Sequence, residues 1–121
     1  MLILLAHGSR DSAWRESIHS LAEAVAERLD DDAVRVAFMQ FEGPTLPEVV
    51  RAAVGKGRKT LKLLPLFMAS AGHVDKDIRP MVEELAREYP DTTLELLTPV
   101  GEDEHFPGLI LDIITGPSGL S

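Results

Sequence analysis

The chain has 121 residues, of which 45% are hydrophobic, and it carries no cysteine and a formal net charge of −8 at pH 7. This length suffices for one domain whose core needs no disulfide or structural metal, and the lack of cysteine excludes thiolate metal sites, thiol nucleophiles and redox switching. The negative charge disfavours nucleic acid and anionic membranes as partners, because both bind through clustered Lys and Arg.

Hydrophobic spacing and turn residues predict four strands that alternate with four helices. The strands are expected at residues 1–6, 34–39, 61–67 and 93–97, and the helices at about 12–30, 46–54, 74–89 and 107–114. Apart from Lys62, the segment 61–67 is apolar, which is typical of a strand buried on both faces of a parallel sheet. Thr45 and Glu48 have the spacing of a capping box at the start of the second helix.

This alternation predicts an α/β fold with a four-stranded parallel sheet, right-handed crossovers and helices on both faces. We expect one domain over residues 1–115 and a flexible tail over 116–121. The short apolar segment 1–6 cannot span a bilayer, and we interpret the chain as a soluble cytoplasmic protein. If the strand order is 2-1-3-4, it reverses between the first and third strands, and ligands bind beyond the carboxyl ends of the strands at such a point.

Two histidines follow the strands that flank this reversal. His7 comes directly after the first strand, and His73 follows a loop of small residues, 68–72, after the third. Each histidine alone is commonly a loop residue hydrogen-bonded to backbone. Together, at one edge of the sheet, they predict a site where neutral imidazole coordinates a divalent ion or accepts a proton. A loop without bulky side chains also lets its backbone approach a flat ligand closely.

Other charged residues are expected near the same edge. Arg10, Lys76 and Arg79 can neutralise anionic groups there in spite of the acidic total. Glu42 follows the second strand, where it is equally a candidate for binding metal, taking a proton or contacting substrate, or a plain loop acid. His105 lies among acids and is either a surface group or a peripheral metal contact.

Four stretches carry a resemblance to a known family. They are His7-Gly8-Ser9-Arg10 after the first strand and residues 36–48, 64–67 and 71–78. In this order and at this length they resemble the small single-domain sirohydrochlorin chelatases of the class II type. The resemblance implies a chelatase-like fold equivalent to half of a flavodoxin-like protein. It covers almost the whole chain up to the last helix.

The resemblance implies insertion of a divalent metal into sirohydrochlorin with release of two protons, on a route to cobalamin or sirohaem. Cobalt is the expected metal, with nickel or iron as alternatives, and no further cofactor is expected. The residues expected to hold the metal and act in catalysis are His7, as proton acceptor, and His73. Expected substrate contacts are Arg10, Glu42, Met68, Ala69, Ser70, Ala71 and Gly72. The family resemblance also implies a homodimer.

Two other functions were weighed against this one. A phosphoryl-transfer enzyme with His7 as nucleophile is disfavoured, because such enzymes place an arginine directly before the histidine and this chain has Ala6. A non-catalytic carrier of metal or tetrapyrrole needs the same pocket, so the sequence does not separate it from a chelatase. The chain also lacks an extended basic patch, so binding of a polycarboxylate would depend on backbone N–H groups and a few cations.

Overall fold

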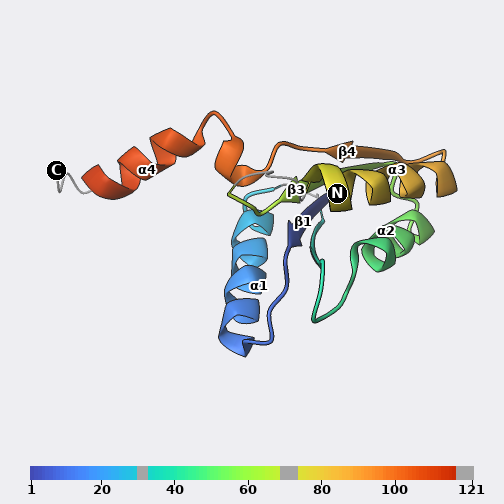
Figure 1. Ribbon diagram of the computed structural model, residues 1–121, viewed down its shortest axis with the longest axis horizontal. Helices are drawn as coiled ribbons and strands as arrows, with labels where there is room; N and C mark the ends of the chain where they lie inside the picture. The colour runs from blue at the N-terminus through green and yellow to red at the C-terminus, as the bar shows by residue number, and fades with distance from the viewer. Residues whose placement is uncertain (30–32, 69–73, 117–121) are drawn as a thin grey trace.

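The sheet is the frame that positions every other element. In the computed structural model, which describes residues 1–29, 33–68 and 74–116, four parallel strands pair in the order β2-β1-β3-β4 (Figure 1). Their bounds are β1 Leu2–Ala6, β2 Val34–Phe38, β3 Thr60–Pro65 and β4 Thr93–Leu96. Leu4 lies opposite Val36 on one side and Leu64 on the other. The predicted strand order is confirmed, and the reversal lies between β1 and β3.

The helices follow the predicted pattern with three differences. Their bounds are α1 Ser12–Ala26, α2 Leu46–Gly55, α3 Arg79–Glu88 and α4 Phe106–Thr115. The α-helical hydrogen bonding of α1 stops four residues before the expected end at Asp30, because the N–H groups of Arg28 and Leu29 bond three residues back and tighten the last turn. The expected helix 74–89 starts as a π-helical turn, η1 (Val74–Ile78), and a short 3-10 turn, η2 (Val100–Glu102), precedes α4.

Two apolar cores cover the two faces of the sheet. Ile3 and Leu5 of β1 point to the face covered by α2 and α3, whereas Leu4 and Ala6 point to the face covered by α1. These four side chains are at most 2% exposed. A strand buried on both faces needs apolar residues at every position, which is why the alternation expected of a half-exposed strand is missing from the sequence.

The last helix does not join either core. Among the described residues of α4 none is buried, and Figure 1 shows the helix pointing away from the sheet. Helices therefore do lie on both faces, as predicted, but α4 is not one of those that cover the sheet. No helix in the described part of the chain is long and apolar enough to cross a membrane.

The capping box at α2 generates a prediction about acid stability. The Thr45 N–H donates to Glu48 Oε1 at 2.9 Å, and the Glu48 N–H donates to the Thr45 hydroxyl at 3.4 Å. The bonds from the Thr45 backbone and side chain lower the pKa of Glu48. A lowered folded-state pKa means that this stabilisation is present above the ordinary glutamate pKa and is lost as the pH falls through the lowered value.

Thr45→Ala should therefore reduce the free energy of unfolding by about 1 kcal/mol at pH 7. Glu48→Gln should weaken the loss of stability on acidification, because glutamine does not titrate. Urea unfolding at neutral and acidic pH measures both effects. An acid dependence that is the same in Glu48→Gln and in the unchanged protein would contradict the proposed role of the carboxylate.

Candidate functional site

His7 is hydrogen-bonded directly to the segment after β2, and the strand that leads to it is hydrogen-bonded to the segment after β3. Its carbonyl oxygen accepts the N–H of Gln40, just beyond β2, at 2.9 Å. On the other side, the N–H of Leu66, just beyond β3, donates to the Leu5 carbonyl oxygen at 2.8 Å. The backbone of His7 is therefore fixed at the reversal in strand order, as the sequence predicted.

The imidazole ring of His7 is oriented by an aromatic neighbour. It stacks on the ring of Phe67 with 4.1 Å between ring centroids and 28° between ring planes. Phe67 is only 5% exposed and packs in the core on the side of α2 and α3. A buried ring against one face of the imidazole limits the rotation of His7, so its ring nitrogens keep a defined direction.

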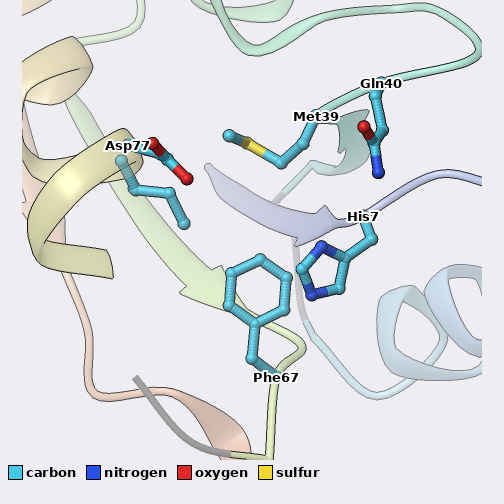
Figure 2. A pocket seen from close by; sticks show the side chains of 6 residues that line it. His7, Met39, Gln40, Phe67 and Asp77 are labelled. Atoms are coloured by element: carbon cyan, nitrogen blue, oxygen red, sulfur yellow. The ribbon is translucent and has the colours of Figure 1, made fainter. Parts of the chain in front are cut away.

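A cavity of about 250 Å³ opens beside this histidine (Figure 2). The residues that line it are His7, Met39, Gln40, Phe67, Asp77 and Ile78. Figure 2 shows Asp77 on the far side of the cavity from His7 and Gln40. Asp77 was not predicted as a site residue, although it follows His73 by four residues and lies between the expected rim cations Lys76 and Arg79.

Two glycines make close backbone approaches next to this cavity. Gly8 has φ +104°, and a Cβ there would overlap the carbonyl group of Gln40. Gly101, in η2, donates its N–H to the Phe67 carbonyl oxygen at 2.9 Å, and a Cβ there would overlap the Met68 backbone. The segment after β4 thus supports the end of β3 from which the histidine-bearing loop departs, a contact that no local sequence signal marks.

Glu42 contacts the loop after β1 instead of lining this cavity. Its Oε2 accepts the Ser9 N–H at 3.1 Å, and its Oε1 lies 3.7 Å from Arg15 Nε. The carboxylate side chain is 9% exposed. These contacts connect the loop after β2 to the loop that carries His7, so Glu42 has a structural part in placing that loop.

The exposed rim carries a cation and apolar side chains. The Arg10 guanidinium lies 4.9 Å from the centroid of the Phe41 ring, a cation–π contact. Phe41 is 58% exposed and Met68 is 67% exposed. These two residues follow β2 and β3, the neighbours of β1, so they flank the loop of His7.

The predicted site residues that remain are residues 69–73 and His105. Ala69, Ser70, Ala71, Gly72 and His73 lie outside the described residues. Within the described ranges, no three His, Cys, Asp or Glu side chains come together as metal ligands. His105 does not line the cavity of His7. The His105 N–H donates to Asp103 Oδ1 at 2.8 Å, and His105 Nδ1 lies 2.8 Å from the same oxygen. The backbone bond, followed by the side-chain contact, lowers the pKa of Asp103.

The support of Phe67 and Met68 by Gly101 generates a prediction. Gly101→Ala should lower the free energy of unfolding by about 1–3 kcal/mol, because the new methyl group displaces the Met68 backbone. The change should also move the NMR signals of the His7 ring, which sense the stacked Phe67 ring. Urea unfolding and the two-dimensional spectrum of the histidine rings measure these effects.

Gly55→Ala is the matched control, because a Cβ there meets nothing within 4 Å. It should not destabilise the protein, and it should leave the His7 signals where they are. Equal effects of the two substitutions would contradict the close approach at Gly101.

The chain is a parallel α/β protein with a histidine beside a cavity at the switch point of its sheet. The sequence profile of the CbiX family matches residues 1–115. The chain belongs to the CbiX family.

Individual relatives agree with this assignment. A sirohydrochlorin cobaltochelatase from Methanocaldococcus jannaschii is 38% identical over 77 residues, which are 64% of this chain and 54% of that protein. The chain thus spans about half the length of this relative. The crystal structure of a putative cobalamin biosynthesis CbiX protein from Marinobacter aquaeolei VT8 is 36% identical, with a TM-score of 0.81 over 95% of this chain and 91% of that one.

A longer protein shares the fold. The sirohydrochlorin chelatase SirB from Bacillus subtilis subspecies spizizenii, solved in complex with cobalt, has a TM-score of 0.80 at 21% identity. The match covers 94% of this chain but 49% of SirB. The whole fold described here therefore corresponds to one half of that chain.

Proposed function

We propose that this protein inserts a divalent metal ion, with cobalt foremost and nickel or iron as alternatives, into sirohydrochlorin with release of two protons. The observation that carries the proposal is the fixed imidazole of His7, stacked on Phe67 and facing a cavity at the switch point. Membership of the CbiX family supports it. So do the names of relatives, which are sirohydrochlorin cobaltochelatases.

Imidazole suits the chemistry of metal insertion. The metal, which is a substrate, must lose its waters, be held by ligands that release it, and replace two protons on the ring nitrogens. Neutral imidazole binds cobalt, nickel and iron and also accepts protons near neutral pH. We propose His7 and, from its position in the sequence, His73 as the metal ligands. Two such ligands leave positions open for the macrocycle nitrogens.

The rim residues supply contacts for a flat, polycarboxylate ligand. The exposed side chains of Phe41 and Met68 offer apolar surface to the ring, and Arg10 offers a cation to a carboxylate. We propose that Ala69, Ser70, Ala71 and Gly72 also contact the substrate, because small side chains let the backbone approach it. Glu42 acts there through the loop that it holds, with direct substrate contact as the alternative.

The size of the cavity supports the participation of a second copy of the chain. At about 250 Å³ it is smaller than the roughly 300–1,000 Å³ of ordinary ligand pockets. One copy thus offers one wall of a binding site for a tetrapyrrole. SirB, whose chain contains this fold in about half of its length, has room for two such walls. We therefore propose that the protein acts as a homodimer.

Helix α4 supplies an apolar surface for this dimer. Its exposed aliphatic residues are Leu109, Ile110, Leu111, Ile113 and Ile114, each between 42% and 67% exposed. They form a broad stripe on a ten-residue helix, whereas Asp112 lies on the other side. Stable interfaces bury about 1,200–2,000 Å² in total, and an apolar helix from each copy contributes a large share of such an area.

A first prediction tests the catalytic role of His7. His7→Ala should lower the rate of cobalt insertion about a hundredfold or more, because it removes both a ligand and a proton acceptor. The assay follows the absorbance change of sirohydrochlorin with Co²⁺ against a protein-free control. His19→Ala, at an exposed position of α1, should keep full activity.

Each outcome of this assay has a distinct meaning. An active His7→Ala protein would refute the role of His7. A spectrum that shows tetrapyrrole binding without faster insertion, already with the unchanged protein, would favour a carrier over a chelatase.

A second prediction tests the α4 interface. Ile113→Glu places a charge in the apolar stripe and should weaken self-association at least tenfold, measured by sedimentation equilibrium. Asp112→Asn, one residue away on the polar side, should leave self-association unchanged. A monomeric mass for the unchanged protein at micromolar concentration would contradict the dimer.

A further inference from the structure

Asp77 was not among the predicted site residues, although its neighbours Lys76 and Arg79 were expected near the same edge. It lines the same cavity as His7, and of the described residues around that cavity these two alone have ionisable side chains. In Figure 2 its carboxylate lies across the cavity from the imidazole. A group placed between them therefore has a base on each side.

The backbone at Asp77 is held in place while its side chain stays exposed. Ile78, the next residue, is completely buried in the core under α2 and α3. Asp77 itself is exposed and belongs to η1, a π-helical turn. Such turns are rare, and they are frequent at functional sites because they shift side chains out of the ordinary helical register.

A carboxylate at position 77 favours some parts of the proposed substrate over others. An ionised carboxylate only accepts hydrogen bonds. Sirohydrochlorin carries carboxylates around its periphery, which Asp77 repels, and its ring N–H donors lie at the centre. The complementary arrangement places the ring nitrogens, where the metal enters, near Asp77.

We propose, resting on the chelatase function proposed above, that Asp77 is a catalytic base that takes one of the two protons released by the macrocycle. In this step a ring N–H bond breaks, an O–H bond forms on the Asp77 carboxylate, and the nitrogen lone pair forms the bond to the metal. Because Asp77 is exposed, it then passes the proton to water. His7 lies on the other side of the cavity.

The test compares Asp77→Asn with the unchanged protein in steady-state cobalt insertion. Asparagine keeps the size of the side chain and removes the base, so kcat should fall about a hundredfold. The KM for sirohydrochlorin and the affinity for Co²⁺ in the absence of tetrapyrrole should change by less than about threefold. Glu83→Gln, which removes an exposed carboxylate from α3, is the matched control and should keep full kcat.

A second variant separates catalysis from structure. Asp77→Glu retains a carboxylate and should recover a substantial part of the kcat lost in Asp77→Asn, with both folds checked by circular dichroism. Equal losses in the two variants would overturn the proposal in favour of a structural role. A loss of Co²⁺ affinity that matches the loss of kcat would overturn it in favour of a metal ligand.

The proposal and the function on which it rests fail differently. If the unchanged protein does not accelerate insertion, both are overturned. If the unchanged protein is active and Asp77→Asn has the same kcat, the role of Asp77 alone is overturned.

Discussion

The position of His7 depends on the parallel pairing of β1 with a strand on each side. Leu4 lies opposite both Val36 and Leu64, and the pairing continues past the end of the strand, where the N–H of Gln40 bonds to the carbonyl oxygen of His7. Burial on both faces of the sheet removes the remaining freedom of β1. His7 therefore follows a strand that is paired on both sides and buried on both faces, which suits the preorganised ligand or base proposed for it.

Next to His7, buried side chains give way to exposed ones within a few residues. Phe67 is buried and stacks on the imidazole. The next residue, Met68, has its backbone against Gly101, but its side chain is largely exposed, as that of Phe41 is after β2. This arrangement suits the large flat ligand proposed above. The stacked His7 and Phe67 would position the reacting atoms, and the exposed Phe41 and Met68 would contact the surrounding ring.

The proposed homodimer would account for both the exposed helix α4 and the small cavity. A helix with a broad apolar stripe and no buried residue is costly to leave in water, and a cavity of about 250 Å³ leaves most of a tetrapyrrole uncovered. In the proposed homodimer, a second copy of the chain would cover the helix and supply an opposite wall for the ligand.

The sequence alone predicts the strands, the helices and the place of His7 at the carboxyl edge of the sheet. These features depend on local periodicity, such as the unbroken apolar run of β1 and the spacing of Thr45 and Glu48 at the start of α2. The expectation that β3 is buried on both faces was wrong, because Lys62 is exposed and burial alternates along most of that strand. The sequence also predicted the order of the strands, since the alternation of strands and helices limits the topologies available.

Only the tertiary structure decided which residues surround the histidine. Phe67, Asp77 and Gly101 come from three separate segments, and their approach depends on how the ends of β3, η1 and η2 pack together. The same holds for Glu42, whose contact with Ser9 joins two loops 33 residues apart. Such contacts leave no periodic trace in the sequence, because packing between distant segments is set by shape and burial and not by local spacing.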